Sequence, residues 1–212
     1  MIELAVFLGN PGKKYSKNRH NVGFLLADRL PYSLSWQKKF KGLYTSIDKE
    51  QVQDEASGKI HFLKPETFMN LSGIPIAEAS AFYKIQKEDI MVVHDELELP
   101  LGTVSLKFGG GLGGHNGLRS VKGCLGSADF WRIRIGIGRP DSRLPGEGGP
   151  PGSGEGIVDW VLSNFSKEEE TILDEVLTKT MDLMLNTFIE DPKTLLKNWA
   201  KKKVITNEGD NL

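Results

Sequence analysis

The sequence predicts an α/β fold, a single globular domain in which helices flank a mixed, mostly parallel twisted sheet. Short apolar segments of strand length alternate along the chain with segments of helical periodicity, and the last quarter is helical. The length of 212 residues, with 39% hydrophobic and 26% charged residues, suits one domain with a substantial core. We therefore expect residues 1–212 to form one domain that ends in helices over 166–203.

The first half of the chain begins with a strand and a short helix. Ile2–Leu8 is an apolar run closed by the turn residues Gly9–Gly12, which is typical of a strand followed by a tight turn. Asn21–Leu30 carries apolar residues at helical spacing and stops at a proline. Leu43–Leu63 contains two β-type stretches around the turn Ser57–Lys59, which predicts a hairpin.

The second half alternates between helices and strands. Ile74–Ile85 is predicted to be a helix with a proline in its first turn, where the missing N–H does no harm. A further helix, Gly117–Leu125, follows the glycine-rich segment Gly109–Gly114. A capping box at Ser166 and the pair Asp191–Pro192 begin the two C-terminal helices. Three more strands are expected, at Ile90–His94, Thr103–Phe108 and Phe130–Ile137.

One segment has no regular pattern. Pro140–Gly156 holds ten glycines and prolines in 17 positions, so we expect residues 139–156 to form a flexible loop. Such a loop is either a surface insertion or a mobile flap beside an active site.

The composition excludes several classes of protein. Lys and Arg number 27 against 28 Asp and Glu, so any polyanion must be bound by a local basic patch. No apolar run is long enough to span a membrane, and the N-terminus lacks the features of a signal peptide. The single cysteine, Cys124, excludes an intramolecular disulfide and fits a reducing compartment, so we expect a cytoplasmic protein.

Polar residues collect after the strands, at the positions where an open α/β sheet binds its ligands. Any one of them alone would be an ordinary turn or cap residue, but together they outline a site at one edge of the sheet. The six residues are Asn10, His20, Asn70, Asp95, His115 and Asn116.

This set favours a His–Asp pair that activates water. No activated serine or cysteine motif occurs, and the histidine spacing does not match a zinc site, so we expect no metal and no cofactor. His20 is the best candidate base, and His115 is the second, as a hydrogen-bonding support or a ligand contact. His94 is a poor partner for the adjacent Asp95, because successive side chains of a strand point to opposite faces. His61 is expected to be structural.

The glycine-rich segment has a competing explanation. Gly109, Gly111 and Gly114 match the dinucleotide fingerprint G-x-G-x-x-G, with Asp129 downstream. Because Asp129 precedes the next strand, it would not reach a ribose, and we favour glycines that let the backbone approach a ligand. Basic residues around this segment suit a large anionic substrate, and Lys201–Lys203 either extends that surface or is a solvated tail.

Longer motifs carry a resemblance to a known family. They occur in order along the chain: Phe7–Gly12, Arg19–Phe24, Lys64–Gly73, His94–Gly102, Gly109–Leu118, Arg132–Pro140 and Val158–Leu162. Together they resemble bacterial peptidyl-tRNA hydrolases over about residues 2–165.

The resemblance implies hydrolysis of the ester between a peptide, or an N-blocked amino acid, and the 3′ ribose of tRNA, which recycles tRNA in translation. It implies His20 as the base, Asp95 as its support and Asn10 as the residue that distinguishes blocked from free aminoacyl groups. The partner is then the acceptor stem and 3′ end of peptidyl-tRNA, bound by a monomer without metal, cofactor or membrane. Lys107 and Arg134 match positions that hold tRNA phosphates. The residues implied to bind the rest of the substrate are Tyr15, Phe68, Met69, Asn70, His115 and Asn116.

Ser105 departs from this resemblance, because many members of the family carry a basic residue there, which weakens the expected grip on phosphate. Two alternatives remain open. One is an RNA-binding protein that keeps the scaffold without turnover, and the other is a dinucleotide-binding oxidoreductase.

Overall fold

A single eight-stranded sheet forms the centre of the structure. The computed structural model describes residues 1–140 and 154–205. The strands are β1 (Leu4–Phe7), β2 (Gln37–Lys39), β3 (Gly42–Asp48), β4 (Lys59–Pro65), β5 (Ile90–Glu96), β6 (Thr103–Phe108), β7 (Trp131–Gly136) and β8 (Lys202–Lys203). Their order across the sheet is β2-β3-β4-β1-β5-β7-β6-β8, so β1 and β5 lie side by side near its middle.

The predicted mixed sheet flanked by helices is confirmed, but the proportion of parallel strand pairs is lower than expected. The four central strands β4, β1, β5 and β7 are parallel, as expected. The pairs β2–β3, β3–β4, β6–β7 and β6–β8 are antiparallel, so antiparallel pairs outnumber parallel ones. The reason is the short connection between several strands, because a parallel crossover needs a dozen residues or more. Thus β6 follows β5 after a short turn and runs in the opposite direction.

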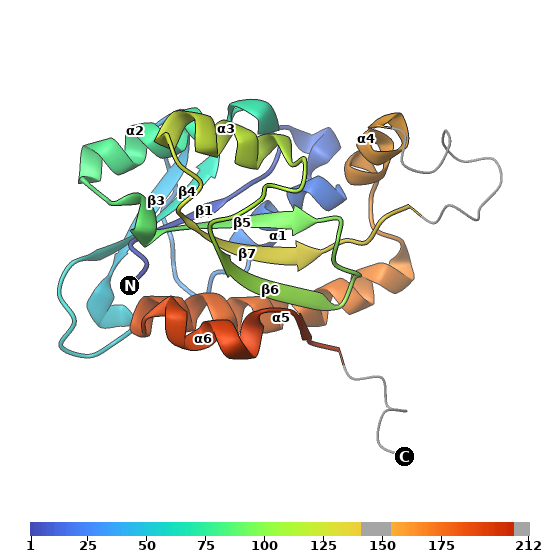
Figure 1. The fold of residues 1–212 in the computed structure, drawn as a ribbon. Helices are drawn as coiled ribbons and strands as arrows, with labels where there is room; N and C mark the ends of the chain where they lie inside the picture. The colour runs from blue at the N-terminus through green and yellow to red at the C-terminus, as the bar shows by residue number, and fades with distance from the viewer. Residues whose placement is uncertain (141–153, 206–212) are drawn as a thin grey trace, which may run out of the picture.

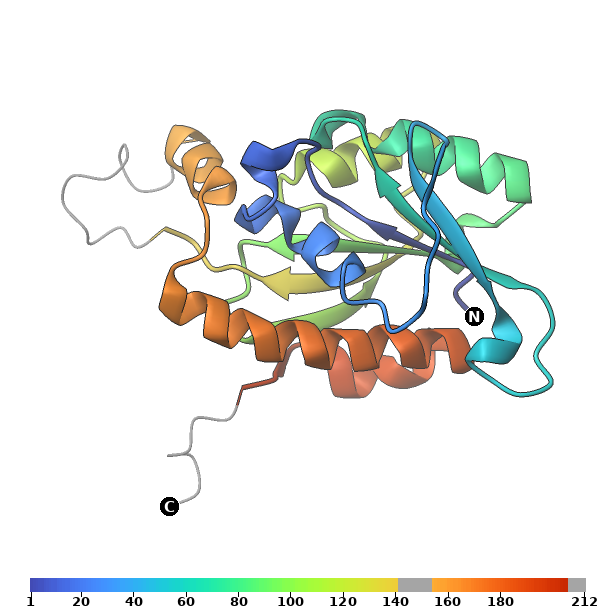
Figure 2. The same ribbon diagram turned by 180° about the vertical axis from the view of Figure 1, so that it is seen from behind.

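Helices cover both faces of the sheet (Figures 1 and 2). The helices are α1 (Val22–Ala27), α2 (Gly73–Tyr83), α3 (Asn116–Leu125), α4 (Gly154–Leu162), α5 (Lys167–Ile189) and α6 (Pro192–Trp199). One face carries α2 and α3, and the opposite face carries α5 and α6. Helices α2 and α3 pack closely at Gly73, where an added Cβ would lie 2.2 Å from the carbonyl oxygen of Ser120.

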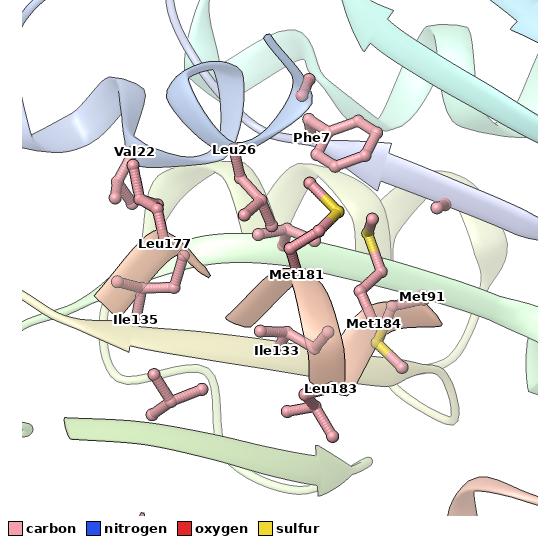
Figure 3. Close-up of a cluster of buried hydrophobic side chains, with 14 of the residues drawn as sticks. Phe7, Val22, Leu26, Met91, Ile133, Ile135, Leu177, Met181, Leu183 and Met184 are labelled. Atoms are coloured by element: carbon pink, nitrogen blue, oxygen red, sulfur yellow. The ribbon is translucent and has the colours of Figure 1, made fainter. Parts of the chain in front are cut away.

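The core is divided by the sheet into two clusters of buried side chains. On the face covered by α5, strand residues such as Phe7, Met91 and Ile133 pack against Met181 and Met184 (Figure 3). The cluster on the other face joins the alternate residues of the same strands to α2 and α3. Because consecutive strand residues point to opposite faces and both faces are covered, β1 is apolar throughout and β5 is apolar over its first four residues, Ile90–Val93.

Two boundaries differ from the predicted ones. The helix α4 begins at Gly154, so the loop expected over 139–156 extends too far, and residues 141–153 of it lie outside the described residues. Lys202–Lys203 forms an edge strand instead of the end of a helical tail, since backbone pairing with β6 decides the conformation of so short a segment. Within the described residues, no helix combines the length and the apolar character that a membrane span needs.

Candidate active site

The carboxyl ends of β1 and β5 place the candidate residues beside one another. The chain leaves β1 through the loop that contains Asn10, and the 3₁₀ turn Arg19–Asn21 then presents His20. Asp95 is the sixth residue of β5, whose end lies next to that of β1 because the two strands are parallel neighbours. His115 precedes the first residue of α3. Residues from three separate parts of the sequence therefore meet at one edge of the sheet, as expected.

His20 and Asp95 form a close hydrogen-bonded pair. The distance from His20 Nδ1 to Asp95 Oδ1 is 2.7 Å. The carboxylate is almost fully buried, with a side-chain exposure of 2%, whereas the imidazole keeps 12%. An ionised carboxylate can only accept, so Nδ1 carries the proton and Nε2 keeps its lone pair. That assignment leaves Nε2 able to take a proton from a bound molecule.

The same carboxylate oxygen also accepts a hydrogen bond from His115. The distance from His115 Nε2 to Asp95 Oδ1 is 3.1 Å. On the other side of the ring, His115 Nδ1 accepts from the N–H groups of Gly117 and Leu118 at 3.1 and 3.3 Å, which caps α3. Since two backbone donors point at Nδ1, the proton of the neutral ring lies on Nε2, and His115 donates to Asp95. His115 therefore serves as a donor that anchors the carboxylate.

Charge and burial act in opposite directions on the pKa values of this pair. Burial lowers the pKa of His20, but the charge of Asp95 and the hydrogen bond to it outweigh this effect, and the pKa lies above its ordinary 6.5. Burial also raises the pKa of Asp95, yet the neighbouring histidines His20 and His115 hold it well below its ordinary value. The carboxylate is thus ionised near neutral pH, and the imidazolium of His20 is stabilised when it forms.

Asn10 joins the loop after β1 to two other segments of the site. Its side-chain oxygen accepts from the N–H of Met69 at 2.8 Å, which holds the 3₁₀ turn Met69–Leu71 in place. Its backbone N–H donates to Asn21 Oδ1, and its carbonyl oxygen accepts from Asn21 Nδ2, both at 2.9 Å. Asn10 is 7% exposed, so these bonds lie largely out of solvent. They fix the turn that carries His20 relative to the loop after β1.

The turn that carries His20 is also fixed from the C-terminal side of the chain. Arg19 makes a bidentate pair with Glu169, with N–O distances of 3.0 and 2.7 Å. Its guanidinium lies 3.7 Å from the centre of the Trp160 ring, and its backbone N–H donates to the carbonyl of Ser163 at 2.9 Å. A planar guanidinium that is stacked and doubly bonded has little freedom. These contacts restrain the backbone on the N-terminal side of His20.

The other two histidines are buried, and neither bonds to the carboxylate of Asp95. His94 is 1% exposed, its Nδ1 donates to the carbonyl of Asp95 at 2.7 Å, and burial holds its pKa well below the ordinary value. His61 lies in β4, its Nδ1 is hydrogen-bonded to the hydroxyl of Tyr44 at 2.7 Å, and its ring stacks on Tyr83. Burial lowers the pKa of His61 to about 4.

The residues expected to bind substrate lie on segments that flank the His20–Asp95 pair, and most of their side chains reach solvent. Phe68 is 55% exposed, an unusual position for a large apolar side chain, and Asn70 and Asn116 are exposed as well. Met69 is buried against Gly117, where an added Cβ would lie 2.5 Å from its sulfur. This packing brings the turn that carries Asn70 against the start of α3, where Asn116 lies. Tyr15 is half-buried in the 3₁₀ turn Lys13–Tyr15.

Lys107 and Arg134 lie on neighbouring strands, next to the glycine-rich segment. Arg134 Nε donates to Glu96 Oε2 at 2.9 Å. Between them, Arg132 is buried and donates to the carbonyls of Gly109 and Gly111. Burial and then the charges of Arg132 and Arg134 lower the pKa of Lys107. Lys107, Arg132 and Arg134 thus place three cations near the carboxylate of Glu96.

Three groups of the site could also hold a metal ion. Ligand atoms of His20, Asp95 and His115 all lie within 4.8 Å of one another. In the arrangement described, the histidine nitrogens that face Asp95 are its hydrogen-bond donors, so a metal would have to displace these protons. The expectation of a metal-free site stays a prediction.

Two groups that hold the site in place, Glu96 and the Arg19–Glu169 pair, were not predicted from the sequence. Glu96 is a buried carboxylate at the end of β5, whose first four residues are apolar, and that position was the available signal. The pairing of Arg19 with Glu169 joins residues 150 positions apart and had no local signal.

Comparisons with known proteins identify the family of this chain. The family model described as peptidyl-tRNA hydrolase matches residues 4–207. A peptidyl-tRNA hydrolase of Treponema pallidum is 44% identical over 210 residues, which cover 97% of this chain and 98% of that protein. One of Citrifermentans bemidjiense is 46% identical over 182 residues, covering 86% of this chain and 89% of that protein.

Solved structures give the same result. The crystal structure of a peptidyl-tRNA hydrolase in complex with N-propanol has a TM-score of 0.79 at 32% identity, covering 92% of this chain and 93% of that one. The peptidyl-tRNA hydrolase of Acinetobacter baumannii has a TM-score of 0.74 at 33% identity, covering 93% and 91%. The likeness therefore extends over nearly the whole chain in both sequence and fold.

Proposed function

The chain belongs to the peptidyl-tRNA hydrolase family, and from this premise we propose that it hydrolyses the ester between a peptide, or an N-blocked aminoacyl group, and the 3′ ribose of tRNA. The observation that carries the proposal is the pairing of His20 Nδ1 with the buried Asp95 at 2.7 Å, which leaves Nε2 as a base. We propose further that the protein acts in the cytoplasm as a monomer and without a metal ion, as the resemblance implies.

In the proposed reaction, His20 Nε2 removes a proton from a water molecule as its oxygen attacks the ester carbonyl. A positioned general base contributes roughly 10²–10⁴-fold to the rate. The imidazolium that forms is stabilised by Asp95, and His115 keeps the carboxylate oriented through its own hydrogen bond. The tetrahedral intermediate then collapses, the bond to the ribose oxygen breaks, and the imidazolium returns its proton to that oxygen.

The negative charge of the intermediate needs hydrogen-bond donors. The side-chain amides of Asn70 and Asn116 are suitable, because both are exposed on segments that pack together beside the pair. One well-placed donor contributes about 3–4 kcal/mol to such a transition state. A base and one or two donors suffice for an ester, because its alkoxide is a much better leaving group than the nitrogen anion that an unprotonated amide would expel.

Asn10 is proposed to act in the choice between blocked and free aminoacyl groups. Its bond to the N–H of Met69 holds the turn that carries Asn70, so we propose that both act near the α-nitrogen of the substrate. A charged α-ammonium would lose its hydration in a site suited to a neutral amide N–H. Free aminoacyl-tRNA is therefore expected to be a poor substrate.

The direct test is to incubate the protein with an N-acetyl-aminoacyl-tRNA and to follow the release of deacylated tRNA. The same tRNA with a free α-amine serves as the matched control. The proposal predicts turnover of the blocked substrate and little of the free one. Tight binding of tRNA without cleavage of any blocked substrate would instead indicate an RNA-binding protein, and equal rates on both would contradict the selection at the α-nitrogen.

A further inference from the structure

The C-terminal segment adds a short basic strand to the sheet edge nearest the phosphate-binding candidates. After α6 ends at Trp199, the chain turns along β6, and Lys202 and Lys203 pair with Val104 and Thr103 (Figures 1 and 2). The hydroxyl of Ser105 donates to the carbonyl of Ala200 and thereby fixes the start of this segment. Beyond β8, the N–H of Val204 donates to the carbonyl of Gly102 at 2.8 Å. The strand is thus held at both ends.

The register places this strand on a line with Asp95. Asp95 pairs with Ile135, Ile135 with Val104, and Val104 with Lys202. Neighbouring strands are about 4.8 Å apart, so three steps put the backbone of Lys202 roughly 14 Å from that of Asp95. Lys203 pairs with Thr103, which shares a face of β6 with Ser105 and Lys107. Lys203 therefore lies on the same face of the sheet as Lys107 and Arg134, whereas Lys202, which pairs with Val104, lies on the opposite face at the same edge.

The lysine side chains of this segment reach solvent. Lys201, Lys202 and Lys203 are all exposed. The ammonium of Lys202 lies 4.3 Å from the centre of the Trp199 ring, a contact that orients a cation without neutralising it. A hollow of about 310 Å³ beside the strand is lined by Lys179, Asp182, Trp199, Lys202, Lys203 and Val204. Lysines exceed carboxylates around it, which suits a polyanion.

We propose that Lys201–Lys203 binds phosphates of the tRNA acceptor stem, beyond those held by Lys107 and Arg134. This proposal rests on the proposed function, which places the 3′ end of the RNA at His20. The distance of roughly 14 Å from Asp95 lies within the span of a few nucleotides, so the stem that follows the 3′ end reaches β8. The serine at position 105 fits this arrangement, because its hydroxyl holds the segment that supplies the cations instead of contributing a cation itself.

The competing explanation is that these lysines only protect an exposed sheet edge from pairing with other chains. Lysines that only protect the edge could lie anywhere along the strand, and they would not change the affinity of the protein for RNA. Phosphate binding requires a dependence on salt, because each neutralised phosphate releases about 0.7–0.9 counterions. The salt dependence of RNA affinity therefore separates the two explanations.

The test compares the triple variant Lys201→Gln, Lys202→Gln, Lys203→Gln with wild-type protein. A matched control removes three lysines from the far side of the sheet: Lys38→Gln, Lys59→Gln, Lys87→Gln. A second variant, with arginine at 201, 202 and 203, keeps the charge. The Kd for uncharged tRNA is measured over a series of salt concentrations, together with KM and kcat for N-acetyl-aminoacyl-tRNA.

Each lost contact is expected to weaken binding roughly five- to eightfold at 0.1 M salt and to reduce the salt slope by about 0.7–0.9. The glutamine variant should show this loss in Kd and KM with kcat retained, whereas the arginine variant and the matched control should resemble wild type. Unchanged affinity and salt slope in the glutamine variant would overturn the proposal.

A short substrate keeps this outcome separate from the fate of the proposed function. An N-acetyl-aminoacyl ester of a CCA trinucleotide lacks the stem and should be hydrolysed equally by wild type and the glutamine variant. If wild-type protein cleaves neither this ester nor the full substrate, the proposed function fails. If it cleaves both and the glutamine variant loses nothing on the full substrate, only the role of β8 fails.

Discussion

Replacing Asp95 with asparagine isolates the charge of the buried carboxylate. The new amide oxygen can accept the same hydrogen bonds from His20 Nδ1 and His115 Nε2, at 2.7 and 3.1 Å in the wild-type protein. The tautomers and the orientation of both rings can thus persist. What is lost is the negative charge that stabilises the imidazolium of His20 in the transition state.

The size of the loss follows from this geometry. Opposite unit charges with centres about 4 Å apart interact by roughly 4 kcal/mol at an effective dielectric constant near 20. A barrier raised by about 4 kcal/mol slows a reaction roughly 10³-fold. Because substrate contacts lie on other residues, the decrease should appear in kcat and leave KM within about threefold.

The pH profile gives a second and independent readout. In wild type the base form of His20 is required, and its pKa lies above 6.5, so kcat/KM should decline as pH falls through that raised pKa. In Asp95→Asn, burial acts without the opposing charge, so the pKa of His20 falls and the acid limb moves to lower pH. Asp48→Asn, an exposed carboxylate on β3, is the control. A loss of kcat below tenfold with an unmoved acid limb would refute the role given to Asp95.

Three further predictions concern the supports of the fold and site. Glu169→Gln should lower the free energy of unfolding, measured by denaturant titration, by about 2 kcal/mol. This is less than the ~3–5 kcal/mol lost when a fully buried pair is broken, because Glu169 is partly exposed. Activity should fall with it, since Arg19 restrains the turn of His20; full stability in Glu169→Gln would contradict this. His61 has a pKa of about 4 in the folded state against an ordinary 6.5, so the unfolded state binds its proton first and stability should decline as pH falls from about 6.5 to 4. His61→Gln should flatten that part of a Tm-versus-pH curve, and an unchanged curve would show that another group is responsible. Gly73→Ala should destabilise the protein by roughly 1–3 kcal/mol, because the new Cβ would lie 2.2 Å from the Ser120 carbonyl oxygen; a Tm equal to that of wild type would show that α2 and α3 can separate without cost.

Much of the fold could be predicted because the information is local. The apolar runs of β1 and β5 predict strands, and the capping box at Ser166 predicts the start of a helix, each from a few neighbouring residues. The strand β8 could not be predicted, because two lysines have no preference for a strand and only pairing with β6 creates it. The excess of antiparallel pairs was missed because it also depends on β6, which pairs with β7 and β8 across long stretches of sequence.

In the candidate site, too, the features encoded by nearby residues could be predicted, and those that depend on distant contacts could not. Asn10, His20 and Asp95 could be placed at one edge because each lies at or beyond the carboxyl end of a strand. The sharing of one Asp95 oxygen by His20 and His115 depends on how the start of α3 approaches β5, and no spacing in the sequence encodes that distance.

The measurement that tests the central claim most directly is the single-turnover rate of His20→Gln on N-acetyl-aminoacyl-tRNA across pH. Glutamine keeps a polar side chain beside Asp95 but cannot act as a base near neutral pH. The account predicts a rate about 10²–10⁴-fold below that of wild type and the disappearance of the acid limb. A rate within threefold of wild type, with the same pH dependence, would contradict it.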